Sequence, residues 1–220
     1  MNYLSFSLWG DKPIYNVGII RNAELWKIIY PDWKMVVYYN NTVPIDTVNK
    51  LNELDVLTIN FTEKNLYGMF WRFFAVDLPD SEYCVFRDAD SRITKREKMA
   101  VDEWIKSGKS LHVMRDHPAH GIPFGSDRLG ILGGMWGIKK GFISITDMIE
   151  NFTKNKTLGY GSDQTFLKSV YSIFENDRTT HDEFFEKKPF PEQREPGRFV
   201  GDRIDELDNP IGNDYKLFLK

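Results

Sequence analysis

The sequence has a single cysteine, Cys84, and therefore no partner for an intrachain disulfide. Cys84 stands inside an apolar run, so we expect a buried thiol and a reducing, cytoplasmic setting. No apolar stretch approaches the length that spans a membrane. The first ten residues lack the basic flank and the long apolar core of a signal peptide. We therefore expect no integral membrane segment and no signal peptide.

The chain also lacks a strong excess of charge and a glycine-rich nucleotide motif. Its formal net charge of −3 at pH 7 gives no electrostatic reason to expect binding to nucleic acid or to an anionic membrane. No glycine pattern matches the dinucleotide-binding fingerprint or a P-loop. The 220 residues, of which 41% are hydrophobic and 28% charged, are enough for one substantial core. We expect a single domain over residues 1–220.

Strand and helix patterns alternate in the first third of the chain. The strand patterns cover residues 4–8, 35–39 and 56–61, and the helical patterns cover 18–29 and 45–54. Such alternation is typical of the α/β class, with a parallel sheet flanked by helices. An apolar helix over 66–76 follows, and its one charge is Arg72. That guanidinium either reaches solvent or pairs with an anion, and a phosphate and a carboxylate are equally good partners.

Two carboxylates follow the most apolar strand. Residues 83–86 predict a buried strand, and Asp88 and Asp90 come directly after it. Ligands of open α/β sheets bind where such strands end, and an Asp-x-Asp pair can coordinate a hard divalent cation whose other ligands are water and phosphate oxygens. The alternative is that both aspartates solvate a turn. The arginines at 87 and 92, and a capping box at 94–97 that begins a helix, favour the metal site.

A second polar segment follows the next predicted strand. This strand covers residues 111–114 and leads into residues 115–120. If it is a parallel neighbour of the strand over 83–86, the segment lies at the same sheet edge as Asp88. Its polar residues are then metal ligands, acid–base groups or hydrogen-bond partners of a sugar, or else solvated loop residues. The candidates are Asp116, His117 and His120.

Glycines mark two further places. Gly133 and Gly134 stand between bulky apolar residues, which implies a backbone that something approaches closely, either a sugar ring or another element of the fold. Ser162 is the expected cap of a later helix, with Asp163 in its first turn. The helix dipole alone favours an acid at this position, although the glycine-rich segment before the helix adds weight to a functional role for Asp163. From residue 176 onward the periodicity is lost, which predicts an irregular tail.

Four of these segments, in this order, resemble a known family. They are Arg72 within Phe-Trp-Arg-Phe, residues 86–92, residues 114–118 and residues 132–137. Together they look like small GT-A-type nucleotide-sugar glycosyltransferases of viral and bacterial surface-glycan pathways. The resemblance implies one GT-A-like, Rossmann-related domain with a mainly parallel sheet. It also implies a nucleotide-binding half (1–93), a donor-sugar and acceptor half (94–183) and an irregular tail (184–220).

The resemblance further implies an activity and a donor site. The enzyme would be a hexosyltransferase that moves a sugar from a nucleoside-diphosphate sugar to a glycan or another hydroxyl acceptor. Asp88 and Asp90 would hold Mn²⁺ or Mg²⁺ against the diphosphate of the donor. The residues that would flank the nucleotide are Ser7, Trp9 and Gly10.

The same resemblance implies roles around the reacting sugar. Arg72 or Arg87 would assist the departing diphosphate. The segment Gly133-Gly134 would face the donor sugar, and Asp163 and Gln164 would lie near the transferred carbon. For the carboxylate that orients or deprotonates the acceptor hydroxyl, Asp163 is favoured over Asp116.

A late histidine is the candidate for a third protein ligand of the cation. Residues 179–181 look like a short strand that ends on His181, and related GT-A enzymes can recruit such a histidine. Its imidazole would shift the preference from magnesium towards manganese. The alternative is a solvated loop histidine, with water in its place.

Two other function classes account for part of the sequence. A metal-dependent phosphatase or phosphosugar hydrolase of the haloacid-dehalogenase type also ends a strand in Asp-x-Asp. Its pattern has Thr or Val two residues after the second aspartate, where this chain has Arg92. A non-catalytic carbohydrate-binding module accounts for the aromatic content of 15% but leaves the two carboxylates unexplained.

Overall fold

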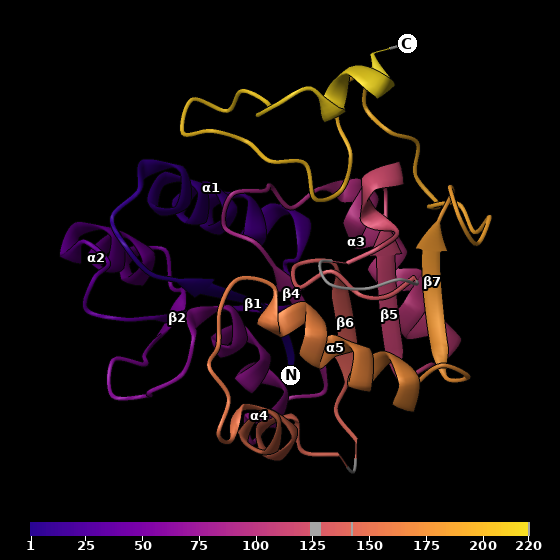
Figure 1. Ribbon diagram of the computed structural model, residues 1–220. Helices are drawn as coiled ribbons and strands as arrows, with labels where there is room; N and C mark the ends of the chain where they lie inside the picture. Colours follow the sequence, from indigo (N-terminus) through magenta and orange to yellow (C-terminus); the bar gives the residue numbers. More distant parts are fainter. Residues whose placement is uncertain (124–128, 142, 220) are drawn as a thin grey trace.

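The computed structural model describes residues 1–123, 129–141 and 143–219, and within them one seven-stranded sheet forms the centre of the protein (Figure 1). The strand order is β3-β2-β1-β4-β6-β5-β7, and all strands except β6 run parallel. The predicted α/β class with a mainly parallel sheet is confirmed. The strands are β1 (Asn2–Leu8), β2 (Lys34–Tyr39), β3 (Leu57–Asn60), β4 (Tyr83–Arg87), β5 (Leu111–Arg115), β6 (Trp136–Lys139) and β7 (Arg178–Asp182).

The antiparallel strand β6 lies between β4 and β5. Strands β4 and β5 therefore end at the same edge of the sheet, as expected, but they are not neighbours. Because β6 runs in the opposite direction, it begins where β4 ends, and Trp136 pairs with Phe86. The segment before β6, which contains Gly133 and Gly134, is thereby brought to the end of β4.

Helices cover both faces of the sheet and create two apolar cores. Helices α1, α2 and α3 pack on one face, whereas α4, α5 and the 3-10 helix η1 pack on the other (Figure 1). Strand β4 serves both cores, with Tyr83 and Val85 in the first and Cys84 and Phe86 in the second, as the two-residue period of a strand requires. The helices are α1 (Pro13–Ile29), α2 (Ile45–Glu53), η1 (Gly68–Asp77), α3 (Lys95–Ser107), η2 (Pro118–His120), α4 (Ile145–Thr153), α5 (Ser162–Ile173) and η3 (Asp214–Phe218).

The predicted start of α3 is confirmed. The Thr94 hydroxyl accepts a hydrogen bond from the Glu97 N–H at 3.2 Å, and Gly108 ends the helix in the left-handed region with φ 71°. Only this half of the expected capping box forms. The Glu97 carboxylate turns into the protein instead, where it accepts a hydrogen bond from the Tyr30 hydroxyl at 3.0 Å and lies 3.1 Å from Arg87.

Three local expectations are wrong. Helix α1 begins five residues earlier than its apolar pattern indicates, at Pro13, because proline suits the first helical turn. The segment predicted as a helix over 66–76 forms the 3-10 helix η1. Helix α5 is capped by Gly161 with φ 82°, and Ser162 is its first helical residue.

The chain after β7 is irregular, as predicted. Over residues 183–219 it contains η3 and one isolated bridge of its own, between Ile204 and Pro210. Figure 1 shows this tail, in yellow, running back above α1. The Ile204 N–H donates to the carbonyl of Asp90 at 2.7 Å, so the tail contacts the turn that follows β4. No helix in the described ranges is long and apolar enough to cross a membrane.

Candidate functional site

Asp88, the first residue after β4, lies against a buried arginine. Its carboxylate forms an ion pair with Arg72, which comes from η1. The Arg72 side chain is 4% exposed and that of Asp88 is 48% exposed, so the arginine holds the inner side of a carboxylate that faces outward. Burial acts to raise the pKa of Asp88, but the charge and hydrogen bond of Arg72 outweigh it and keep the pKa below its ordinary value.

Arg72 also reaches the second acid expected near the reacting sugar. One guanidinium nitrogen lies 3.4 Å from Asp163, whose side chain is almost fully buried at the start of α5. Burial raises the pKa of Asp163, Arg72 opposes that rise, and the nearby charge of Asp88 adds to it. Two carboxylates that are 75 residues apart in the sequence therefore share one cation. Gln164, next along α5, is partly buried beside them.

The lack of side chains at Gly133 and Gly134 lets the two carboxylates and the Arg72 guanidinium lie against this backbone. A Cβ atom at Gly133 would meet the Asp163 carboxylate and the Arg72 guanidinium, and one at Gly134 would meet the Asp88 carboxylate. The expectation that something closely approaches this backbone is confirmed, and in the structure that something is the side chains of the site itself. The Gly134 carbonyl also accepts a hydrogen bond from Arg87 at 2.5 Å.

Asp90 lies under the tail. Its side chain is 14% exposed and lies 3.2 Å from Arg203, which no sequence motif pointed to. Burial raises the pKa of Asp90, the charge of Asp88 raises it further, and Arg203 opposes both. Arg203 is itself 60% exposed, so this ion pair lies at the surface of the site.

Arg87, expected to assist the donor, lies beneath the site. Its side chain is 1% exposed and donates to the Gly134 carbonyl, to the Ser91 hydroxyl at 3.1 Å and to the Met135 sulfur at 3.0 Å. It thus joins the turn after β4 to the loop before β6. This placement makes Arg87 a positioning residue without exposed surface for a ligand.

The three residues expected to flank a nucleotide lie at the end of β1, the strand next to β4. The Ser7 hydroxyl accepts a hydrogen bond from the Arg72 N–H at 2.9 Å and so fixes the start of the Arg72 side chain. Trp9 is 39% exposed, with its ring centroid 6.0 Å from that of Trp71. Gly10 has φ 74° and donates its N–H to Thr42 at 2.7 Å. Of the three, Trp9 offers a ligand an exposed surface.

Asp116 lies outside this group. It is fully buried, accepts two hydrogen bonds from Arg96 at 2.8 and 2.9 Å, one from Arg194 at 2.6 Å and one from the Val200 N–H at 2.9 Å. Every one of these donors is in α3 or the tail. The expected competition between Asp116 and Asp163 is therefore not supported, because Asp116 is saturated as an anchor of the tail.

His181 is not brought to the carboxylates either. It lies in β7, which two strands, β6 and β5, separate from β4. One ring nitrogen lies 2.8 Å from His112 and the other 3.3 Å from Glu103 on α3. Both nitrogens face α3 and the core, so the expected role as third cation ligand does not fit this geometry. The short strand predicted at 179–181 is confirmed as part of β7.

Asp88 and Asp90 fit a divalent cation by their chemistry. Both supply carboxylate oxygens, the ligands that Mn²⁺ and Mg²⁺ accept. The Asp88 side chain is 48% exposed, and the Asp90 carboxylate is paired with Arg203, whose guanidinium a cation would displace. No group of three or more His, Cys, Asp or Glu side chains with metal-site geometry occurs in the described residues. A cation here would therefore take its remaining ligands from water and substrate.

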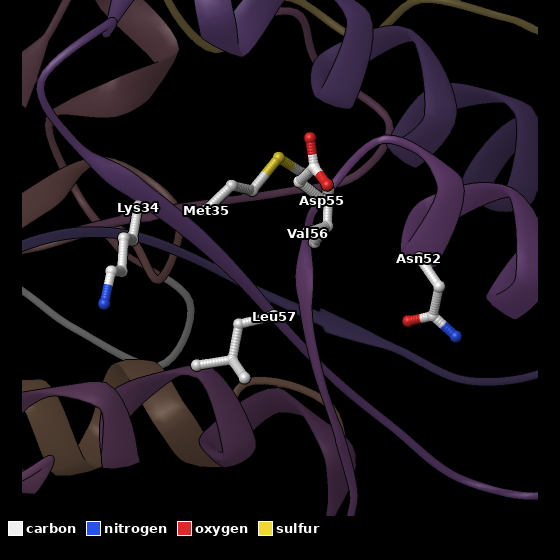
Figure 2. Close-up of a pocket in the computed structure, with 6 residues that line it drawn as sticks. All are labelled: Lys34, Met35, Asn52, Asp55, Val56 and Leu57. Carbon is white, nitrogen blue, oxygen red and sulfur yellow. The ribbon is translucent and has the colours of Figure 1, made fainter.

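A separate hollow lies at another edge of the sheet. It measures about 380 Å³ and is lined by residues at the start of β2, the end of α2 and the start of β3 (Figure 2). Those are the amino ends of the strands, opposite the edge where β4 delivers Asp88. The lining residues are Lys34, Met35, Asn52, Asp55, Val56 and Leu57. This hollow takes no part in the site.

No family model and no curated protein matches the chain. Solved structures of glycosyltransferases do resemble it in fold. TarS of S. aureus gives a TM-score of 0.59 at 14% identity over 83% of this chain and 58% of that chain. The galactosyltransferase LgtC, in complex with donor and acceptor sugar analogs, gives 0.51 at 12% identity over 83% of this chain and 74% of that chain.

A third similar structure is the mannosyltransferase PcManGT from Pyrobaculum calidifontis in complex with GDP-Man and Mn²⁺. It gives a TM-score of 0.51 at 10% identity over 85% of this chain and 58% of that chain. The chain thus spans less than two thirds of the length of TarS and of PcManGT. At these identities the likeness shows the fold, a single α/β domain of the GT-A glycosyltransferase type.

Proposed function

We propose that the protein is a metal-dependent glycosyltransferase that moves a sugar, a hexose by preference, from a nucleoside-diphosphate sugar to a hydroxyl acceptor. The observation that carries the proposal is the convergence of Asp88, Arg72 and Asp163 on the glycine pair at the carboxyl edge of a GT-A-type sheet. Ligands of open α/β folds bind at that edge. The surface-glycan pathway and the cytoplasmic setting stay predictions.

In this mechanism Asp88 and Asp90 bind the cation, whose positive charge would stabilise the diphosphate as it departs. Arg72 fixes the Asp88 carboxylate from below and keeps it ionised, because its charge lowers the pKa of Asp88. Trp9 offers its exposed ring to the base of the donor. Each of these groups is held in place before the substrate binds, which is the condition for effective electrostatic catalysis.

Asp163 is the carboxylate that we place nearest the transferred sugar. The lack of a side chain at Gly133 lets it reach the same space as Asp88. Its raised pKa results from burial and suits a group that accepts a proton or a hydrogen bond from a hydroxyl. Arg72 prevents the pKa of Asp163 from rising further and also keeps Asp88 ionised. A change at Arg72 would therefore affect both carboxylates.

The test is the release of nucleoside diphosphate from a panel of UDP-, GDP-, ADP- and dTDP-sugars, with Mn²⁺, with Mg²⁺ and with a chelator. We expect metal-dependent release from at least one donor. The same samples are assayed with sugar phosphates for release of inorganic phosphate. Phosphate release without any use of sugar nucleotides would contradict the proposal and favour the phosphosugar hydrolase.

A further inference from the structure

A second hollow lies between η2 and the tail. It measures about 200 Å³, and its lining combines aromatic rings with polar groups. Arg203 lines this hollow, is exposed and forms an ion pair with Asp90. The hollow therefore lies beside the proposed cation site. The lining includes His117, His120, Phe199, Asp202, Arg203 and Tyr215.

Asp202 gives this hollow an unused hydrogen-bond acceptor. The residue is 2% exposed, and one carboxylate oxygen accepts a hydrogen bond from Arg198 at 2.5 Å. The other oxygen, Oδ1, is buried and has no hydrogen-bond partner in the parts of the chain that the structure describes. A buried acceptor without a donor is costly, so a donor from a bound molecule would be stabilising there. Burial also raises the pKa of Asp202, although Arg198 opposes the rise.

The two histidines present ring nitrogens to the hollow. Nδ1 of His120 accepts a hydrogen bond from the Asp116 N–H at 3.2 Å, and Nδ1 of His117 accepts one from the Ala119 N–H at 3.0 Å. Each proton therefore resides on Nε2, which is a donor. Burial lowers the pKa of His120 to about 3, so its ring is neutral at pH 7.

The rest of the lining favours a neutral ring over an anion. Phe199 is 6% exposed and packs on His117 with 4.8 Å between centroids, and Tyr215 adds a second ring to the wall. The Asp202 carboxylate disfavours phosphate, and the guanidinium of Arg203 is already paired with Asp90. Aromatic faces with a few fixed donors and acceptors suit a ring with apolar C–H faces and hydroxyl edges.

The hollow adjoins the donor side of the site through two contacts. Arg203 lines it and contacts Asp90 at 3.2 Å. A Cβ atom at Gly201 would lie 2.6 Å from the sulfur of Met135, the residue after the glycine pair. The wall that holds Asp202 is therefore packed on the glycine loop, whose backbone approaches the Asp88 and Asp163 carboxylates.

We propose that this hollow binds one pyranose ring of a saccharide, with Asp202 Oδ1 accepting a hydrogen bond from a ring hydroxyl and His120 donating to another. The description of that saccharide as the acceptor rests on the proposed function, whereas its binding does not. Asp202 and His120 thus select a neutral, hydroxylated acceptor over a phosphorylated one.

The experiment titrates the full chain, without donor, with methyl glycosides of glucose, galactose, mannose and N-acetylglucosamine, followed by NMR. We expect at least one to bind. Asp202→Asn should lower the affinity for that glycoside by about ten- to a hundred-fold, because it loses a hydrogen bond to a charged group. Phe199→Leu keeps an apolar side chain but removes the aromatic ring, and should also weaken this binding. Glu206→Gln, at an exposed acid of the same tail, should bind as the wild type does.

Three outcomes overturn the proposal. The first is the absence of glycoside binding. The second is an affinity that is the same in the wild type, in Asp202→Asn and in Phe199→Leu. The third is displacement of the glycoside by a nucleoside diphosphate, which would assign the hollow to the donor. If Asp202→Asn does not fold, Phe199→Leu decides. Donor cleavage without glycoside binding overturns this inference and leaves the proposed function standing. Glycoside binding without donor cleavage does the reverse.

Discussion

Asp88 and Asp163 show how a buried cation can prepare a site. The charge of Asp88 raises the pKa of the buried Asp163 carboxyl, because a nearby like charge disfavours ionisation. Arg72 resolves this by touching both, and its backbone is held between the hydroxyls of Ser5 and Ser7. A guanidinium suits the position better than an ammonium, since its planar fork can address two carboxylates at once.

A single methyl group should disturb this arrangement. In Gly134→Ala the new Cβ atom would overlap the Asp88 carboxylate, which would have to move away from the glycine backbone. A displacement of about 1 Å in a catalytic group can cost about a hundred-fold in rate, so we expect a comparable loss of donor cleavage. Gly141→Ala is the matched control, because no atom of the described residues lies within 4 Å of its Cβ position. Equal turnover in the two variants would contradict the role of the glycine.

At the scale of elements, antiparallel β6 decides where the site forms. It carries the glycine loop to the end of β4, and the tail then closes over the same place through Asp90 and Ile204. The alternating helices and strands of the first third, the buried strand before Asp88 and the tail were all predictable from periodicity. The insertion of β6 between β4 and β5 was not, because a four-residue strand carries no signal of its partners or direction.

Asp116 should matter to the tail more than to catalysis. It connects α3 to Arg194 and Val200, so Asp116→Asn should release residues 184–219. We expect a loss of about 3–5 kcal/mol in the free energy of unfolding, the usual cost of breaking a buried ion pair. Hydrogen exchange should show the largest gain within the tail. Asp102→Asn, at a half-exposed pair with Lys98, should change little, and a similar effect of both variants would argue against this anchor.

The pairing of β5 with β7 should make stability depend on pH. Burial lowers the pKa of His112 well below its ordinary value and lowers that of His181, which faces Glu103 and Arg96. The unfolded chain therefore binds protons below about pH 6.5 that the folded chain does not bind, and the free energy of unfolding falls as the pH falls.

The contribution of His112 can be isolated by its removal. Each neutral buried histidine adds a slope of up to about 1.4 kcal/mol per pH unit, so His112→Gln should reduce the loss of stability between pH 6 and 5 by about that amount. Denaturant unfolding at both pH values measures it. A slope unchanged by the substitution would mean that His112 is protonated in the folded protein.

For the whole molecule, sequence reasoning named several of the residues that the structure brings together but not all of their neighbours. Asp88, Asp90, Arg72 and the glycine pair stand in motifs whose chemistry is visible along the chain. Arg203 was missed because it lies in an irregular tail and its partner Asp90 is 113 positions away. Asp202 was missed because it lines a hollow that forms only when the tail lies against η2. His181 misled because a strand that ends on a histidine does not reveal which neighbour the strand will have.

Asp88 and Asp90, in the function proposed above, hold a cation against a diphosphate. Calorimetric titration of the wild type with UDP, GDP, ADP and dTDP, in Mn²⁺ and in chelator, measures it most directly. We expect one diphosphate to bind in Mn²⁺ alone, and Asp90→Asn to lose more than the roughly 10- to 100-fold that removal of an outer-shell partner costs. Asp32→Asn, at an exposed acid, should bind as the wild type does. Diphosphate binding that survives both the chelator and Asp90→Asn would contradict the account.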